Sequence, residues 1–404
     1  MKRLFAIILC ISIALMLAAC SVDNPYEDYN STSIAPTESN TAPKDDTTGP
    51  NTNQTFEQLP IFAVSVPTVT QEEKADDGTV IFRYTFQNIS LVGPEPEVAD
   101  EIILDFLNQI DATAADAEAI KTAAMSAYRN GETWNPYLCQ ITFEPMRIDT
   151  SVISFFGSYT NYSGEPHPET TYPSITYDLV NGRKLQLGDI LTKMESSEPL
   201  YNCVIESLNE QKDDKQLYTG FKDTVKERFS KDITKDASWF LAQDGLCFYF
   251  SPYEIAPYSS GLIIAKIPYD SLTGILDDAY FPAEEDISGG DVRADVFNES
   301  DLEKYTQFSE IVMEEGSKIL LHTDQSVYDI RIYSGSWSAN GTVFTQEHAV
   351  FAAHTLTPGD AVMIESMFTD TLPNLQLTYR TNGNSVCKYI SFDKQTNTVI
   401  LIDG

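Results

Sequence analysis

The sequence predicts an α+β fold, in which an antiparallel sheet with flanking helices is followed by a small, mostly β C-terminal domain. Strand-like and helix-like stretches are grouped apart instead of alternating regularly, which disfavours a parallel sheet built from strand–helix–strand units. Turn signals such as Asp76-Asp77-Gly78 and Asn181-Gly182 lie beside strand candidates. A chain of 404 residues also has room for more than one domain with a sizeable core.

The first twenty residues have the layout of an export signal. Lys2 and Arg3 precede an uncharged apolar run over residues 4–16, which is shorter than the roughly 20 residues of a membrane span. The run ends in Leu17-Ala18-Ala19-Cys20, which resembles a bacterial lipobox whose thiol takes a diacylglycerol. We therefore predict a lipoprotein signal peptide at 1–19, a lipidated Cys20, and an anchored protein on the extracytoplasmic face of the cell membrane. An ordinary signal with a chance Cys20 is the alternative.

Residues 20–56 form a predicted polar tether that starts at Cys20, and an α+β domain is expected over residues 57–282. Its first strand shows alternating apolar residues from Val80 to Phe86, and a helix follows with Val98, Ile102, Phe106 and Ile110 at helical spacing. An alanine-rich helix is expected next, up to about Tyr128. Further strands are predicted over 138–146, 152–160 and 171–179.

The second half of this domain reads as helices followed by a hairpin. Leu200, Val204 and Leu208 share one helical face, as do Phe221, Val225 and Phe229. A hairpin is predicted at 239–250 around Asp244-Gly245, followed by a strand at 261–267. Residues 283–299 read as an acidic linker, and residues 300–404 as a β-rich domain with strands near 328–332, 375–379, 386–392 and 399–402.

The charge of the chain is strongly negative. Lys and Arg number 26 against 60 Asp and Glu, a formal charge of −34, and loss of Lys2 and Arg3 with the signal would make it more negative. This balance argues against nucleic acid as a partner, because phosphate binding needs clustered basic residues. It would attract a cationic partner in a salt-dependent way. Solubility alone is the competing explanation.

No cofactor or catalytic motif is visible. The histidines His167, His322, His348 and His354 lack the spacing of a zinc hydrolase, and nucleophile-elbow, phosphate-loop and calcium-loop patterns are absent. Beyond Cys10 and Cys20, the cysteines are Cys139, Cys203, Cys247 and Cys387, and they match no zinc pattern. We expect reduced thiols, and one disulfide among three pairings stays open. The sequence thus predicts a protein that is not an enzyme and holds no metal.

The most unusual local composition is the tyrosine-rich stretch at residues 157–178. Tyr combines a rigid apolar ring with a polar tip and is common at contact surfaces. The candidate contact residues are Tyr159, Tyr162 and His167 in this stretch, together with Tyr253 and Tyr258 further on. A hairpin loop with Tyr on a sheet edge is the alternative interpretation.

Several motifs also carry a family resemblance. They are Gly164-Glu165-Pro166-His167-Pro168, Leu185-Gln186-Leu187-Gly188-Asp189-Ile190-Leu191, Asp244-Gly245-Leu246-Cys247-Phe248-Tyr249-Phe250 and Pro252-Tyr253-Glu254-Ile255-Ala256-Pro257-Tyr258. Over residues 57–282 the chain resembles an envelope domain of unknown function. This domain forms the extracellular part of a lysozyme-binding anti-sigma factor. It also precedes the catalytic domain of some peptidoglycan deacetylases. The resemblance implies an extracellular module.

Three functional hypotheses follow. The first is a non-catalytic, surface-anchored envelope protein that binds a cationic, lysozyme-like protein or a cell-wall fragment. The second is a wall-acting enzyme with a carboxylate-only site, which needs two acids about 5–9.5 Å apart across a cleft. The third is a structural or assembly module. We expect the first, with the membrane as an additional partner through the lipid.

Overall fold

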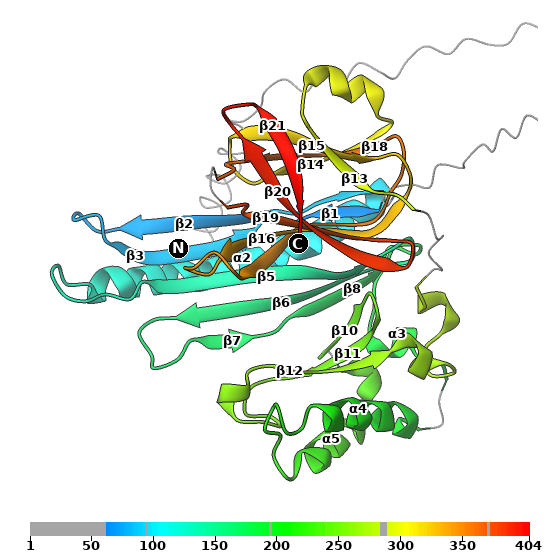
Figure 1. Cartoon of the computed structure of the whole chain (residues 1–404). Coiled ribbons are helices and arrows are strands. Elements are labelled where there is room, and N and C mark those ends of the chain that lie inside the picture. Colours follow the sequence, from blue (N-terminus) through cyan, green and yellow to red (C-terminus); the bar gives the residue numbers. More distant parts are fainter. Residues whose placement is uncertain (1–61, 94, 194–195, 237, 283–288, 370–371) are drawn as a thin grey trace, which may run out of the picture. The chain divides into compact units, whose positions relative to one another are not determined.

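The structure is a computed structural model that describes residues 62–404, apart from residues 94, 194–195, 237, 283–288 and 370–371 (Figure 1). The predicted signal peptide, Cys20 and the tether lie outside the described residues. The described chain has the α+β composition that the sequence predicts. None of its helices combines the length and apolar character needed to cross a bilayer.

A long, mostly antiparallel sheet forms the first layer, and we call it the long sheet. In spatial order its strands are β2 (Thr68–Lys74), β3 (Val80–Gln87), β5 (Tyr137–Ile148), β6 (Val152–Tyr162), β8 (Ser174–Asp178) and β9 (Arg183–Lys184), with β7 (Glu169–Thr171) beside β6. The strands β3 and β5 run parallel, because the helix α2 lies between them in the chain and carries it back across the sheet. The strands predicted over 80–86, 138–146 and 152–160 are confirmed, whereas the one predicted over 171–179 is divided between the end of β7 and β8.

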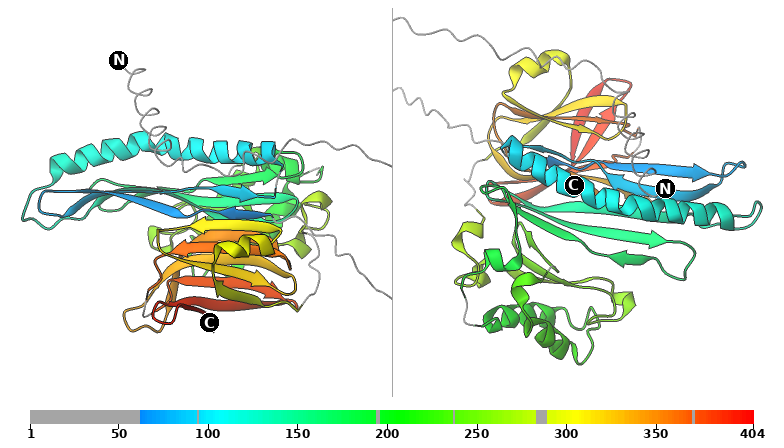
Figure 2. Two further views of the ribbon diagram at one scale, coloured as in Figure 1. Left: turned by 90° about the horizontal axis from the view of Figure 1, so that it is seen from above. Right: turned by 180° about the vertical axis from the view of Figure 1, so that it is seen from behind.

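The helix α2 (Pro96–Ala127) covers one face of the long sheet, and the C-terminal strands lie on the other side (Figure 2). Its side chains Ile102, Phe106 and Ile110 are buried against residues of β5, β6 and β8. The sequence predicts two helices here, whereas the structure has one helix of 32 residues. No Gly or Pro follows Pro96 within this range, so nothing local breaks the helix at the alanine-rich stretch.

A second region, which we call the middle lobe, follows the long sheet at residues 187–280. Its helices are α3 (Leu187–Ile190), α4 (Glu198–Glu210), α5 (Phe221–Phe229), η1 (Ile233–Lys235), η2 (Tyr258–Ser260), η3 (Tyr269–Leu272) and η4 (Asp278–Tyr280), and its sheet is β10 (Trp239–Ala242), β11 (Gly245–Phe250) and β12 (Ile263–Pro268). The apolar faces of α4 and α5 are buried against this sheet. The predicted helices and hairpin are confirmed.

The C-terminal region is a sandwich of two sheets that share one core. One sheet has the order β21 (Thr398–Asp403), β20 (Asn384–Asp393), β19 (Leu375–Thr381), β16 (Val327–Trp337), β17 (Phe344–Leu356), β1 (Ala63–Ser65) and β4 (Ser90–Val92). The other has the order β13 (Val292–Val296), β15 (Ser317–Thr323), β18 (Asp360–Ser366) and β14 (Gln307–Val312), and η5 (Glu299–Lys304) connects β13 to β14. The C-terminal region is thus β-rich, as the sequence predicts.

Two features of this sandwich differ from the predicted linker and domain division. Residues 292–296 lie in the predicted 283–299 linker, yet they form β13, because Val292, Ala294 and Val296 turn toward the sandwich core between polar neighbours. The strands β1 and β4, which belong to the predicted N-terminal domain, complete the larger sheet of the sandwich. The sandwich therefore draws strands from both ends of the described chain.

A buried arginine, Arg147, joins the end of β5 to the middle lobe. Its Nε and Nη2 atoms lie 2.6 Å from Oδ2 of Asp149, and its Nη1 donates to the hydroxyl of Tyr269 and the backbone carbonyl of Tyr280 at 2.8 and 2.6 Å. The Arg147 side chain is completely buried. A buried guanidinium is tolerated only with such partners, so this contact fixes the lobe on the sheet.

A second arginine, Arg331 of β16, holds the same end of β5 from the sandwich side. Its guanidinium donates to the backbone carbonyls of Pro145 and Met146, and its Nε donates to Oδ1 of Asp329 at 2.8 Å. The three regions therefore meet at residues 145–149.

The four cysteines outside the first twenty residues are free thiols, as expected. Cys139 and Cys247 are buried, and Cys203 and Cys387 are partly exposed. Burial raises the pKa of Cys139 to about 11 and that of Cys247 to about 12. Both thiols are therefore protonated at neutral pH and are poor nucleophiles or metal ligands.

The replacement Arg147→Met tests the junction with the middle lobe. Removing one partner of a buried ion pair leaves the other charge uncompensated, so we expect the free energy of unfolding to fall by about 3–5 kcal/mol. Urea denaturation followed by circular dichroism would measure this loss.

Arg293→Met is the matched control. Arg293 pairs with Asp324 at the surface, where both side chains are more than half exposed, and such a pair contributes about 0–1 kcal/mol. Equal losses in the two variants would contradict a structural role for Arg147.

Candidate functional site

Three of the five candidate contact residues come together on one surface. The ring of His167, from the loop between β6 and β7, lies 4.9 Å from that of Tyr258, and the Tyr258 ring lies 5.4 Å from that of Tyr253. Tyr253 is 65% exposed and Tyr258 37% exposed. We call these three residues the aromatic triad. Its members come from two regions, the long sheet and the middle lobe.

A tight turn after β11 presents Tyr253. The backbone N–H of Glu254 donates to the carbonyl of Ser251, and the carboxylate of Glu254 accepts from the N–H of Ser251 at 2.9 Å. Tyr253 itself has a φ of 70°, in the left-handed region that costs a non-glycine residue about 1 kcal/mol or more. The turn therefore holds Tyr253 in a backbone conformation that is unfavourable for a residue with a side chain.

The loop that carries His167 is also tightly folded. The carboxylate of Glu165 accepts from both the N–H and the hydroxyl of Ser163, at 2.8 and 2.6 Å. Gly164 has a φ of 105°, and a Cβ there would lie 2.7 Å from the hydroxyl of Tyr137. Glycine is thus required at this point of the loop, which places His167 against the lobe.

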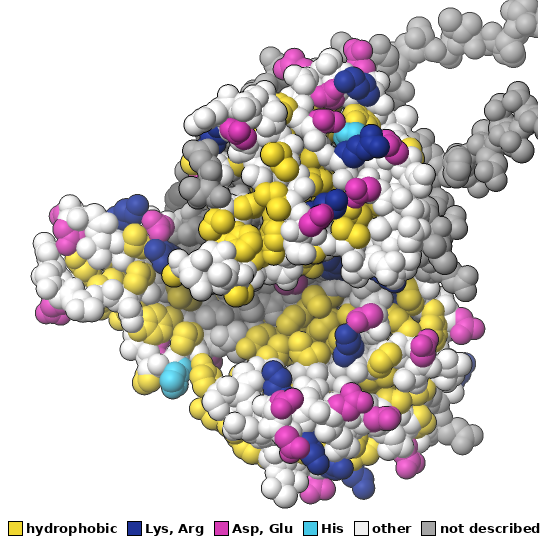
Figure 3. Space-filling view, viewed as in Figure 1, with side chains coloured by type: hydrophobic (Ala, Val, Ile, Leu, Met, Phe, Trp, Pro, Cys, Tyr) yellow, Lys and Arg dark blue, Asp and Glu magenta, His cyan; other side chains and the backbone are white. Residues whose placement is uncertain are grey.

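Aromatic side chains also pack where the long sheet meets the lobe. Phe156 of β6 contacts Tyr172, Phe240 and Tyr249, and the Tyr249 hydroxyl donates to the carbonyl of Tyr172 at 2.7 Å. Figure 3 shows hydrophobic side chains gathered along a hollow on this side of the molecule. These contacts give the surrounding loops a rigid support.

The surroundings of the aromatic triad are acidic. Glu165 in the loop that carries His167 and Glu169 at the start of β7 are exposed. Burial raises the pKa of Glu254 above its ordinary value, whereas Arg228, whose Nη1 lies 3.8 Å from the Glu254 carboxylate, opposes this shift. Hydrogen bonds from Ser163 lower the pKa of Glu165 and keep it ionised. The triad and its neighbours can therefore offer a ligand aromatic surface as well as negative charge.

The other two candidate residues lie elsewhere. Tyr159 turns toward α2, where its hydroxyl donates to Oδ2 of Asp116 at 2.6 Å, and burial followed by this hydrogen bond raises its pKa. Tyr162 lines a wide-open pocket of about 410 Å³ with Arg83, Pro166 and Pro168. The structure thus places Tyr159 between sheet and helix, and Tyr162 beside the two prolines that flank His167.

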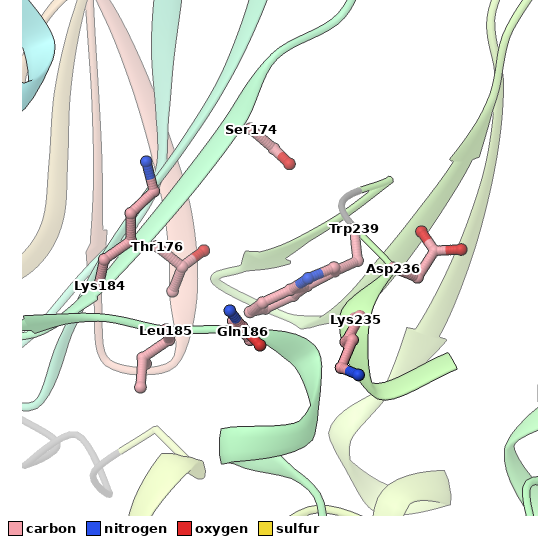
Figure 4. Close-up of a pocket in the computed structure, with 8 residues that line it drawn as sticks. All are labelled: Ser174, Thr176, Lys184, Leu185, Gln186, Lys235, Asp236 and Trp239. Atoms are coloured by element: carbon pink, nitrogen blue, oxygen red, sulfur yellow. The ribbon is translucent and has the colours of Figure 1, made fainter. Parts of the chain in front are cut away.

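The sequence did not single out a second pocket, of about 270 Å³, which we call the Trp239 pocket (Figure 4). It is lined by Ser174, Thr176, Lys184, Leu185, Gln186, Lys235, Asp236 and Trp239. The only carboxylate in this lining is Asp236, and its two oxygens are bound by Arg228 at 2.6 and 2.7 Å. This pocket therefore lacks the pair of acids that a carboxylate-only hydrolase needs.

The histidines are dispersed. His322 lies 2.8 Å from Asp295, and His348 lies 3.1 Å from Glu144. In the part of the chain that the structure describes, no three His, Cys, Asp or Glu side chains are grouped to hold a metal ion.

These observations define an α+β protein with an exposed aromatic and acidic surface. Residues 188–270 match the model of DUF3298, a family of proteins of unknown function. Tyr253, Tyr258 and Trp239 lie inside this match, and His167 precedes it.

Two solved structures resemble the chain. One is a DUF3298 family member from Bacteroides fragilis, with 19% identity, a TM-score of 0.42, and coverage of 55% of this chain and 96% of that one. The other is a DUF3298 family protein from Pseudomonas aeruginosa, with 15% identity, a TM-score of 0.41, and coverage of 55% and 97%. A search of curated proteins gives no match.

The backbone strain at Tyr253 is testable by comparing two replacements. Tyr253→Gly and Tyr253→Ala both remove the ring, but only glycine accepts the left-handed conformation without a steric cost. We expect the glycine variant to be the more stable of the two by about 1 kcal/mol in chemical denaturation. Equal stabilities, or a more stable alanine variant, would show that the turn carries no strain.

Proposed function

We propose that this protein is a lipid-anchored, non-catalytic envelope protein that binds a cationic, lysozyme-like protein through the aromatic triad. The observation that carries the proposal is the meeting of three exposed rings, His167, Tyr258 and Tyr253, beside carboxylates. The predicted lipid on Cys20 would hold this surface outside the cytoplasmic membrane.

The chemistry of the triad suits the side chains of Lys and Arg. A cation over a Tyr ring gains about 0.5–1 kcal/mol at an exposed site and about 2 kcal/mol or more when water is excluded. Glu165, Glu169 and Glu254 add negative charge around the rings. The formal charge of −34 would further speed the approach of a cationic protein.

The family resemblance supports the lysozyme-like partner. Residues 57–282 resemble the extracellular domain of a lysozyme-binding anti-sigma factor, and the DUF3298 match lies within this range. A cell-wall fragment is the second candidate partner, because the exposed face of Tyr253 offers a sugar ring an apolar surface. A carboxylate-only enzyme and a structural module are the further alternatives. The pairing of Asp236 with Arg228 disfavours a carboxylate-only active site in the Trp239 pocket.

A binding titration tests the proposal directly. Residues 21–404 are titrated with lysozyme by calorimetry at about 0.1 M and about 1 M ionic strength, between which the screening length falls from about 10 to about 3 Å. We expect saturable binding that weakens at the higher salt. The double variant Tyr253→Ala/Tyr258→Ala should lose at least about tenfold in affinity, because central aromatic contacts contribute about 2 kcal/mol or more.

Two further variants complete this titration. Ile402→Ala removes an exposed apolar side chain of β21 in the sandwich, and it should leave the affinity unchanged.

Because the pKa of Glu254 is raised, its charge is lost at a higher pH than that of exposed acids, so wild-type binding should weaken earlier on acidification than binding by Glu254→Gln. Absence of saturable, salt-sensitive binding would refute the lysozyme-like partner.

A further inference from the structure

The Trp239 pocket lies where the end of the long sheet meets the middle lobe. Ser174 and Thr176 come from β8, and Lys184, Leu185 and Gln186 from β9 and the residues after it. Lys235, Asp236 and Trp239 come from η1 and the start of β10. The volume of about 270 Å³ is close to the lower end of the range for small-molecule sites, about 300–1,000 Å³.

The indole of Trp239 differs from the other two indoles of the chain. Trp134 donates its N–H to the carbonyl of Ile81 at 3.2 Å, and Trp337 donates its N–H to that of Pro373 at 2.8 Å. Trp239 is only 4% exposed, and its N–H makes no hydrogen bond to a described residue; its Nε1 is not one of the fully enclosed polar atoms that lack a partner, so it borders the open space of the pocket. A nearly buried indole usually has such a partner. Its N–H is therefore available to a ligand in the pocket.

Two lysines stand at the same pocket. Lys184 is 53% exposed and pairs with Asp105 at 2.9 Å, and Lys235 is 75% exposed and pairs with Asp232 at 3.0 Å. Neither aspartate lines the pocket. Exposed ion pairs of this kind contribute little to stability, so either ammonium group can turn to a ligand at little cost.

The remaining polar groups favour a ligand that accepts hydrogen bonds. Asp236, the one lining carboxylate, is neutralised by Arg228, and its Oδ1 also accepts from the N–H of Ser238. Ser174 and Thr176 contribute hydroxyl groups, which also pair with the hydroxyls of Tyr249 and Ser154 at 3.4 and 2.8 Å, and Gln186 contributes an amide. Figure 4 shows the indole of Trp239 lying among Gln186, Lys235 and Asp236. The lining thus holds several hydrogen-bond donors and one carboxylate that is already paired, within a chain that is strongly acidic overall.

We propose that the Trp239 pocket binds a small carboxylate-bearing ligand of the size of one sugar ring. The carboxylate accepts from the Trp239 N–H and from the ammonium groups of Lys184 and Lys235. The hydroxyl groups of the sugar meet the Ser174 and Thr176 hydroxyls and the Gln186 amide. This site is separate from the aromatic triad, and it stands whether or not the triad binds a protein.

Nuclear magnetic resonance of the three indole N–H groups tests the proposal. Residues 21–404, labelled with ¹⁵N, are titrated with glucuronate, and the signal of Trp239 is assigned by its loss in Trp239→Phe. We expect a saturable shift of this signal. The signals of Trp134 and Trp337 should stay in place, because their N–H groups are already bonded within the protein. Glucose, which has the ring without the carboxylate, should produce a much weaker shift.

Lysine variants distinguish binding in the Trp239 pocket from non-specific electrostatic attraction of the anion. Lys184→Ala and Lys235→Ala should each weaken glucuronate binding about tenfold, as expected for the loss of one charge-assisted hydrogen bond. Lys231→Ala removes an exposed lysine that pairs with Glu227 outside the pocket, so it should not change the affinity. An equal response to glucose, an unshifted Trp239 signal, or equal effects of all three lysine variants would overturn the proposal.

Discussion

The end of β5 is the constraint on which the rest of the structure depends. Arg147 attaches it to the middle lobe, and Arg331 attaches it to the C-terminal sandwich. Burying two guanidinium groups is costly unless each has a carboxylate and further acceptors, and Asp149 and Asp329 supply the carboxylates. Burial lowers the pKa of the neighbouring His354, so this imidazole adds no third positive charge at neutral pH.

Both candidate sites depend on this junction, because each draws residues from the long sheet and from the middle lobe. The aromatic triad combines His167 of the loop after β6 with Tyr253 and Tyr258 of the lobe. The Trp239 pocket combines β8 and β9 with η1 and β10. A shift of the lobe on the sheet would separate the partners in both. Arg147 is therefore a positioning residue for two surfaces that it does not touch.

Much of the fold could be predicted from local patterns. Alternating residues such as Tyr328, Ile330 and Ile332 identify strands, and the helical spacing of Leu200, Val204 and Leu208 identifies α4. Pairing between distant segments could not be predicted, since β1 has only three residues and its partner β17 lies far along the chain. The strand β13 was not predicted, because its alternation of apolar and polar residues is short and lies in an acidic stretch.

The candidate site was predictable only in part. The sequence indicated the tyrosines, and the period of two along β6 could have shown that Tyr159 and Tyr162 face opposite sides of the sheet. It could not show that two loops bring His167 and Tyr258 together. The free N–H of Trp239 was also beyond prediction, because it depends on which carbonyl groups the fold leaves near that ring.

The junction at residues 145–149 unites the long sheet, the middle lobe and the sandwich into one cooperative unit. Differential scanning calorimetry of residues 57–404 tests it most directly. We expect a single transition whose calorimetric and van't Hoff enthalpies agree. Two or more separate transitions, with the sandwich melting independently of the remainder, would contradict it.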